Sequence, residues 1–600
     1  MQPIPIHSFH IPVMGIAFTI DSPIKVAAFG INSTLSIIED NLIETMRKYY
    51  YNQIKEPYVP IGRKDPDSRA RRITDYLDLV NRIVHDRFTE LKNSAFEAGS
   101  DLMKYFEMLP DASELKQKYQ QLFHMEDVSQ KQQLEDELRQ KMAPGAIEVN
   151  IMTKVDKVNF NRDGTPIEEG SDALAALKGY AKSKLENSAI VFSAGMNPRL
   201  YNYLEKFTVF DAEAWGTFKK KVVIKVSDYR SALIQGKYLA KKGIWVSEFR
   251  IESGLNCGGH AFATQGQLLG PILEEFKNRR EELSQSLFEL YNPAIQAKGQ
   301  AGFKQPHPVK ITVQGGVGTA EEADFLQEYY KMDSVGWGTP FLLCPEATTV
   351  DEHSLELLGK AEEKDIELSK ASPLGVRFHY LKGATAGVER EERIEQGKPG
   401  SPCTEKFLVS NTEFTKEPIC TASKKYQKLK LAQLNAAGLP EEELKAKTQE
   451  VLSKECLCIG LSNAAAIKYD TPFVKKQDGV TVCPGPNIVN FSRTVSLREM
   501  ADHIYGRSNI IEKKHRPHMF VKELQLYVAY LKEQISQTNS PDTKTLKGWT
   551  KFGEELLKGV AYYRDLLGKY SFEKPLAIER GLEVSEKEID RLMSKAIKVA

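Results

Sequence analysis

Two glycine turns near the middle of the sequence have the composition of an anion-binding site. Gly315 and Gly316 follow one short apolar run, and Gly338 and Thr339 follow the next. Glycine permits positive φ and lets a ligand approach backbone N–H groups closely. A helix that opens after the first turn adds unpaired donors and a positive partial charge. The spacing predicts a phosphate site, and two ordinary strand-to-helix turns are the alternative.

A histidine behind a glycine pair is the candidate acid or base. Gly258 and Gly259 stand directly before His260. Such glycines let the backbone pass close to a planar ligand and present the imidazole beside it. Histidine is the usual general acid or base near neutral pH, so we predict that His260 is catalytic; a surface-loop histidine is the alternative. Lys225, in an apolar run, is a candidate cation for a reduced, anionic cofactor, unless its head reaches out to water.

Five of the seven cysteines lie in the last third of the chain, near turns with Gly, Pro or Ser: Cys403, Cys420, Cys456, Cys458 and Cys483. Such loops can hold zinc or an iron–sulfur cluster. The spacings match no ligand signature and include no Cys-x-x-Cys pair, so we predict buried thiols and no metal. An iron–sulfur cluster, which would suit electron transfer, is the less favoured alternative.

The elements that must position these residues alternate between strands and helices. Eight predicted strands begin near positions 12, 34, 146, 189, 221, 244, 309 and 334. The first strand is expected at Ile11–Phe18, and one long helix at Gly266–Ser284. Eight such units with mostly short connections predict an α/β fold, a (β/α)8 TIM barrel, whose chemistry lies at the carboxyl ends of the strands. An open, doubly wound sheet is the alternative.

Two stretches interrupt this alternation. Residues 40–144 are charged and helical in pattern, and they are too long for a simple crossover, so we predict a helical insertion after the second strand. Residues 346–600 are predicted to form a mainly helical C-terminal region with cysteine-bearing loops, in which Ser372–Phe378 returns across the barrel mouth. The barrel is then discontinuous, with parts at 1–39 and 145–345.

The composition is ordinary for a globular protein. The 600 residues include 82 Lys and Arg against 81 Asp and Glu, which gives no electrostatic reason to expect nucleic acid or an anionic membrane. No run reaches the roughly 18 uncharged apolar residues that span a bilayer. The N-terminus lacks the basic and apolar parts of a signal peptide. We therefore expect a cytoplasmic protein without nucleic-acid or membrane partners.

Three motifs, GLNCGGHA, GGVGTAEEADFL and GWGTPFLL, fall in this order on predicted strand ends. They resemble the signature of the nitronate monooxygenase (2-nitropropane dioxygenase) family and of the related flavin-dependent enoyl reductases. The resemblance covers roughly Ile11–Ala347 outside the insertion. Two further segments, PVMG and EVNIM, are similar to the family's Pro-Met turn after the first strand and to the Asn of its third strand. It implies an FMN-binding TIM barrel, a flavoprotein oxidoreductase.

Position by position, the resemblance assigns cofactor contacts to Met14, Gly15, Asn150, Gly258, Gly259, Gly315, Gly316, Gly338 and Thr339. The last four would hold the FMN phosphate through backbone N–H groups and one hydroxyl. The first two would lie against the isoalloxazine ring, and the asparagine would hydrogen-bond to the cofactor. The glycine pair before His260 would pass close to the flavin, and the imidazole would face the substrate.

Two positions depart from the family pattern and leave the substrate open. Asn256 stands where the family commonly has an acidic residue, and Ala261 where it often has a basic one. We predict an FMN-dependent oxidoreductase for a small carbon acid or acyl substrate. One alternative is NAD(P)H-dependent reduction of an enoyl thioester of acyl carrier protein or CoA. A non-flavin barrel enzyme for a phosphorylated substrate and a scaffold subunit are the others. The expected partners are the small-molecule or acyl-thioester substrate and either a second copy or a larger synthase.

Overall fold

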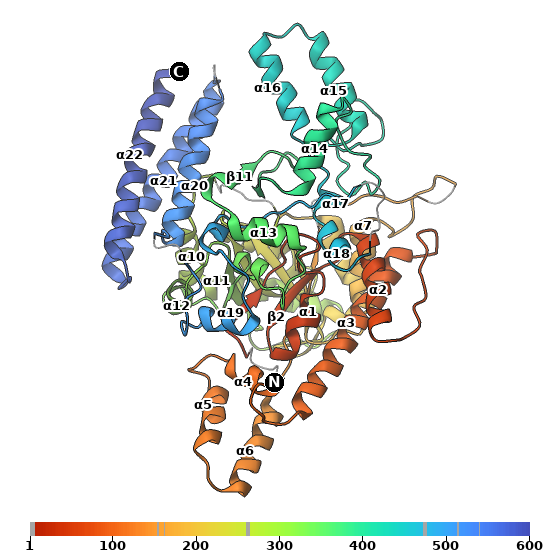
Figure 1. Cartoon of the computed structure of the whole chain (residues 1–600), viewed down its shortest axis with the longest axis vertical. Helices are drawn as coiled ribbons and strands as arrows, with labels where there is room; N and C mark the ends of the chain where they lie inside the picture. Colours follow the sequence, from red (N-terminus) through yellow and green to blue (C-terminus); the bar gives the residue numbers. More distant parts are fainter. Residues whose placement is uncertain are drawn as a thin grey trace.

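The computed structural model describes residues 6–152, 155–160, 163–259, 265–471, 477–512, 515–538 and 541–599. Within these ranges, eight parallel strands close into a barrel in the order β1, β2, β3, β4, β7, β8, β9 and β10. The predicted α/β barrel is confirmed, and the open-sheet alternative is wrong. The barrel lies at the centre of the molecule, with helical projections above, below and to one side (Figure 1).

The barrel strands are short and mostly buried: β1 Phe9–Ile11, β2 Asn32–Ser36, β3 Ile147–Ile151, β4 Ser188–Phe192, β7 Lys220–Val226, β8 Val246–Glu252, β9 Lys310–Gln314 and β10 Ser334–Gly336. Seven lie close to their predicted positions. The strand predicted at Ile11–Phe18 is wrong, because β1 ends where that run begins. Pro12 has no N–H for the ladder, and Gly15 turns the chain with φ +61°.

The connections follow the βα pattern with two differences. The barrel helices are α1 Ser22–Val26, α7 Asp172–Lys182, α8 Pro198–Tyr203, α9 Tyr229–Ala240, α10 Leu269–Asn278, α11 Arg280–Ala297 and α12 Ala320–Glu328. The single helix predicted at Gly266–Ser284 is wrong, because the chain leaves helical geometry at Arg279 and starts α11. A small antiparallel hairpin, β5 Ala212–Ala214 with β6 Thr217–Phe218, was not predicted.

The predicted insertion is helical, but its two halves pack differently. Its helices are α2 Asp40–Gln53, α3 Ser68–Asn93, α4 Asp101–Glu107, α5 Glu114–Gln121 and α6 Val128–Lys141. Helix α3 packs against α2 and α7, so it belongs to the shell of the barrel. Helices α4, α5 and α6 enclose a small separate core around Phe106 and Leu138 and project from the barrel (Figure 1).

The C-terminal region is mainly helical, as predicted. Its helices are α13 Glu352–Lys360, α14 Thr385–Glu395, α15 Lys424–Ala436, α16 Glu441–Leu452, α17 Leu457–Gly460, α18 Asn463–Lys468, α19 Leu497–Ile504, α20 Met519–Ser536, α21 Thr543–Lys569 and α22 Pro575–Val599. An antiparallel pair, β11 Ile366–Ser369 and β12 Phe378–Leu381, accompanies them. Helices α15 and α16 project as a pair, and α20 to α22 pack together (Figure 1). Among the described residues, we find no helix with the length and apolar character to cross a membrane.

Candidate active site

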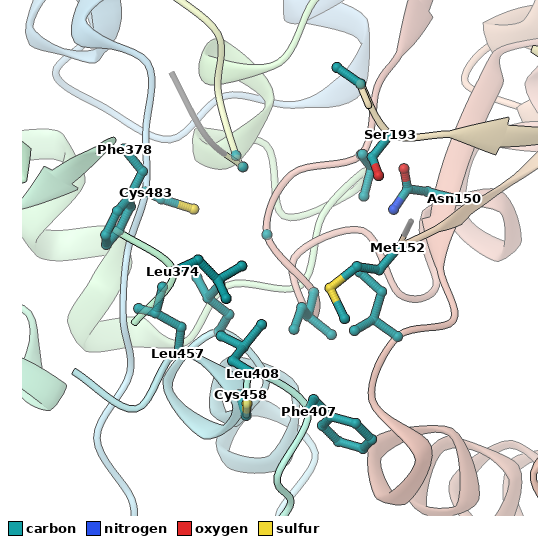
Figure 2. A pocket seen from close by; sticks show the side chains of 18 of the residues that line it. Asn150, Met152, Ser193, Leu374, Phe378, Phe407, Leu408, Leu457, Cys458 and Cys483 are labelled. Atoms are coloured by element: carbon teal, nitrogen blue, oxygen red, sulfur yellow. The ribbon is translucent and has the colours of Figure 1, made fainter. Parts of the chain in front are cut away.

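A large cavity, here called the mouth cavity, opens at the carboxyl ends of the barrel strands. About 1090 Å³ of space lies between its walls, part of it open to solvent. The barrel lines it with Val13, Gly15, Ile16, Ile38, Asn150, Met152, Ser193, Ala194, Lys225, Glu252, Gly258 and Gly259. The C-terminal region supplies a mostly apolar roof of Leu374, Phe378, Phe407, Leu408, Leu457, Cys458, Leu461 and Cys483. The predicted return of Ser372–Phe378 across the mouth is therefore confirmed. Figure 2 shows Asn150, Met152 and Ser193 facing the roof across the cavity.

Backbone of two loops forms one wall of the mouth cavity. Gly15 and Gly258 lie so close that a Cβ on Gly258 would stand 2.6 Å from the Gly15 nitrogen. Around Gly259 there is open space instead. These three glycines line the cavity, as the resemblance implies, whereas Met14 is fully buried behind it. A flat wall of backbone is the surface that a planar ligand can approach.

Asn150 offers an acceptor that no protein group uses. It lies on β3, paired with Ser36 on one side and Val191 on the other. Its side chain is 5 % exposed, and its Oδ1 has no hydrogen-bond partner in the described structure. A buried polar atom without a partner is costly, so this acceptor is available to a ligand N–H group.

A polar network stands beside Asn150. Lys225 Nζ lies 3.0 Å from Glu252 Oε1, and Asn256 Nδ2 and Gln314 Nε2 donate to the same oxygen at 2.9 and 3.0 Å. The Lys225 head therefore stays in the cavity wall, and the alternative in which it reaches out to water is wrong. Glu252 and Gln314 were not predicted as site residues. Each is a polar residue that ends a barrel strand, which is the signal that would have found them.

The two glycine turns lie together beside the mouth cavity. They line a smaller cavity, here called the glycine cradle, whose walls include Gly315, Gly316, Gly338 and Thr339. About 220 Å³ of space lies between these walls, part of it open to solvent. The first two have φ of +104° and +90°. A Cβ on either would stand 2.6 Å from a neighbouring side-chain atom, so the conformation and the space both require glycine. The four residues of the two predicted turns thus line one cavity, and their binding of phosphate stays a prediction.

A distant segment closes the glycine cradle. Gly485 N–H donates to Thr339 Oγ1 at 3.0 Å, and Asn487 Nδ2 donates to the Val317 carbonyl at 3.0 Å. Upstream, the carbonyl of Cys483 accepts the Gly258 N–H at 3.0 Å. The C-terminal region therefore completes the site. No local pattern in the sequence predicts this contact, because Gly485 and Thr339 are 146 residues apart.

A charged layer fills the barrel below the mouth cavity. Arg250 donates to both carboxylate oxygens of Glu148 at 2.8 and 3.0 Å and to Glu248 Oε1 at 2.8 Å. Burial raises the pKa of Glu148, but the Arg250 guanidinium outweighs burial and brings that pKa down to about 2. The layer lies on β3 and β8, the strands that carry Asn150 and Glu252, and so it fixes the floor of the site.

Two groups of predicted site residues remain. His260 lies outside the described residues, so its role stays a prediction. All seven cysteines are free thiols, and Cys458 and Cys483 line the mouth cavity. In the described ranges, no group of three or more His, Cys, Asp or Glu side chains could hold a metal ion. The absence of metal at Cys403, Cys420 and Cys456 stays a prediction.

No family model and no curated protein matches this chain. Among solved structures, it is similar to the enoyl reductase domain of MlnA from the macrolactin biosynthesis cluster of Bacillus amyloliquefaciens, with TM-score 0.33 and 13% identity, over 63% of this chain and 86% of that one. It is also similar to FabK from Thermotoga maritima, with TM-score 0.30 and 13% identity, over 67% and 82%. A nitroalkane oxidase from Streptomyces ansochromogenes matches with TM-score 0.28 and 9% identity, over 64% and 85%. Because these identities and scores are low, the functional proposal rests on the residues of the site.

Proposed function

We propose that this chain is an FMN-dependent oxidoreductase whose active site is the mouth cavity, as the resemblance to the nitronate monooxygenase family implies. The observation that carries the proposal is the position of the glycine cradle directly beside a large cavity at the same end of the barrel. A flavin mononucleotide has the matching two parts, a planar ring and a phosphate. The unpartnered Oδ1 of Asn150 and the crowded Gly258 fit a ring that is held by its edge and face.

Each residue then has a task in the proposed site. Backbone N–H groups of the glycine cradle would hold the phosphate, as glycine turns do elsewhere. Asn150 Oδ1 would accept a hydrogen bond from the ring. Lys225, held by Glu252 at 3.0 Å, would offer a positive charge near the ring. When bound, FMN supplies the transfer of a hydride or electrons to or from the substrate.

The apolar roof would exclude water and hold the substrate, and His260 would move a proton to or from its reacting carbon. A small nitronate has little apolar surface to bury. The roof presents a much larger apolar surface, which includes Leu374, Phe378, Phe407 and Leu408. This observation favours the second candidate, NAD(P)H-dependent reduction of an enoyl thioester, over oxidation of a small carbon acid. The thioester would be presented by CoA or by the carrier protein of a larger synthase.

The first experiment is the visible absorption spectrum of the purified protein, with mass spectrometry of what heat releases. A yellow protein that releases FMN supports the proposal. A colourless protein that cannot be reconstituted with FMN would overturn it, and a copurified phosphate ester would then favour the non-flavin alternative. The substrate is tested next by stopped-flow mixing with NADH, NADPH, nitronates and enoyl thioesters.

A variant links the flavin to the glycine cradle. Gly316→Val places a Cβ 2.6 Å from Leu255 at a φ of +90°, so it should lose FMN while the circular dichroism of the fold is kept. Gly548→Val is the matched control, because open space surrounds that position. Full flavin occupancy in Gly316→Val would refute the phosphate assignment.

A further inference from the structure

The turn after β9, here called the cradle turn (residues 315–318), is held from outside the barrel. The carbonyl groups of residues 316–318 each accept a hydrogen bond from a different side chain of the C-terminal region. In the chain order of these carbonyls, the donors are Arg516 Nη2 at 3.0 Å, Asn487 Nδ2 at 3.0 Å and His503 Nε2 at 2.9 Å. The direction of three consecutive peptide units is therefore set by a region that is distant in sequence.

These carbonyl contacts also fix the direction of the N–H groups in the cradle turn. A trans peptide unit is planar and points its C=O and its N–H in opposite directions. The unit that carries the Gly316 carbonyl also carries the Val317 N–H, which therefore points away from Arg516. In the same way, the Gly315 carbonyl accepts the Ser253 hydroxyl at 3.0 Å and turns the Gly316 N–H away from it. In the described structure, neither of these two N–H groups has a protein acceptor, and both residues line the glycine cradle.

Arg516 also neutralises a carboxylate that lies against the cradle turn. Its guanidinium donates to both carboxylate oxygens of the buried Glu322, at 2.6 and 2.7 Å. Burial raises the pKa of Glu322, but the guanidinium outweighs burial and holds that pKa below its usual range. The same carboxylate accepts the Gly318 N–H at 2.9 Å. Without Arg516, an uncompensated negative charge would therefore stand beside the site proposed for a phosphate.

The guanidinium of Arg516 lies directly against the backbone of the cradle turn. A Cβ on Gly318 would stand 2.7 Å from Arg516 Nε and Nη2, so only glycine leaves room for the guanidinium at this position. Arg516 Nε is buried and has no hydrogen-bond partner in the described structure. The turn therefore has a positive charge packed on its backbone, with one donor that no protein group uses.

We propose, on the basis of the FMN site proposed above, that Arg516 is a positioning residue for the phosphate and makes the site prefer the phosphorylated flavin over riboflavin. Together with Asn487 and His503, it aims the free N–H groups of the cradle turn, and it cancels the charge of Glu322. Because Arg516 belongs to the C-terminal region, binding of the phosphate and docking of that region on the barrel stabilise each other.

The test titrates FMN and riboflavin into the full-length protein, freed of flavin, and follows the quenching of flavin fluorescence. Riboflavin has the same ring and no phosphate. In Arg516→Met, the Kd of FMN should rise roughly 10–100-fold, because a unit charge close to the phosphate is lost, whereas the Kd of riboflavin should stay at the parent value. Arg507→Met is the matched control: this guanidinium belongs to the same region, pairs with Asp502 and donates to the Leu109 carbonyl, so both Kd values should be unchanged.

A second measurement on the parent protein keeps the test sharp even where Arg516→Met fails to fold. Amide hydrogen exchange is compared without ligand, with FMN and with riboflavin. FMN should slow the exchange of residues 485–504 at least about threefold more than riboflavin does, because only FMN engages the turn that these residues hold. Exchange in the projecting helix α6 should be the same in all three samples.

Three results would overturn the inference while leaving the FMN function in place. They are an equal loss of affinity for both flavins in Arg516→Met, an unchanged Kd of FMN in that variant, and exchange at residues 485–504 that FMN slows no more than riboflavin. A parent protein that binds neither flavin would instead refute the FMN function itself, and this inference with it. The two failures are therefore distinguishable.

Discussion

At the scale of single residues, the charged layer inside the barrel explains how a rigid floor is built under the site. Arg250 is 1 % exposed and lies between the carboxylates of Glu148 and Glu248. A buried pair of this kind adds little net stability, but removing one partner leaves an uncompensated charge. The layer therefore fixes the relative positions of β3 and β8 more than it adds to the stability of the fold.

Arg250→Met is predicted to destabilise the protein by about 3–5 kcal/mol, because two buried carboxylates lose their cation. Urea unfolding followed by fluorescence measures this free energy. Arg591→Met is the control: its guanidinium pairs with Glu588 on the surface, and no measurable change is expected. Equal unfolding midpoints for the two variants would contradict the assigned role of the layer.

His260→Ala tests the proposed acid or base directly. The variant should keep its flavin, since phosphate and ring contacts are made elsewhere, while turnover falls about 10²–10⁴-fold. Flavin content is read from the visible spectrum, and kcat from steady-state kinetics. Turnover equal to that of the parent enzyme would remove His260 from the mechanism.

At the scale of elements, the proposed active site is assembled from two sources. The barrel strands contribute polar groups and glycine turns, and the C-terminal region contributes the roof and the segment that closes the glycine cradle. Phe407 lies at the edge of this roof, 7 % exposed, with the Arg69 guanidinium 5.7 Å from the centre of its ring. If the mouth cavity is the active site, as proposed, the roof would govern which substrates it accepts.

Phe407→Ala should raise KM for a long-chain enoyl thioester roughly 10–100-fold, because an aromatic wall contributes about 1.5–3 kcal/mol of apolar contact. A short-chain thioester, which does not reach the roof, should keep its KM. Phe123→Ala is the matched control, since that ring is 61 % exposed on the projecting helices. An equal change in KM for both chain lengths would show that Phe407 acts on the fold and not on the substrate.

At the scale of the whole molecule, barrel and C-terminal region share one hydrophobic core, which includes Leu343 and Leu497 as well as Leu268 and Leu556. Glu523 of α20 lies inside this junction, 2 % exposed, and its Oε2 accepts the Leu269 N–H of α10 at 2.8 Å. Burial raises the pKa of Glu523 to about 7. The folded protein therefore holds a proton on this carboxyl at a pH where the unfolded chain does not.

The sign of the pH effect follows from this shift. A carboxyl whose pKa is higher in the folded than in the unfolded state costs stability as pH rises from about 4.5 to about 7. Glu523→Gln cannot ionise and avoids this cost. Its free energy of unfolding should therefore rise relative to that of the parent between pH 5 and pH 8, by on the order of 3 kcal/mol. Urea unfolding at both pH values measures it, with the exposed Glu583→Gln as control. A difference that does not change with pH would contradict the buried, neutral state of Glu523.

The sequence by itself determined the barrel and the barrel side of the site. Strand runs and turns are local: β-branched residues, proline and glycine act on their immediate neighbours, so seven strands and the four residues of the glycine cradle were predictable. The first strand was misplaced because an apolar run reads alike in a strand and in a buried turn, and only Pro12 and Gly15 separate the two.

What the tertiary structure alone decided is everything that depends on contacts between distant segments. Glu252 became a site residue because its carboxylate faces Lys225 and Gln314 from neighbouring strands. The roof and the closing segment at Gly485 arise because a shared core folds the C-terminal region back over the barrel. Burial depends on contacts between residues that are distant in sequence, so no short stretch of sequence could predict it.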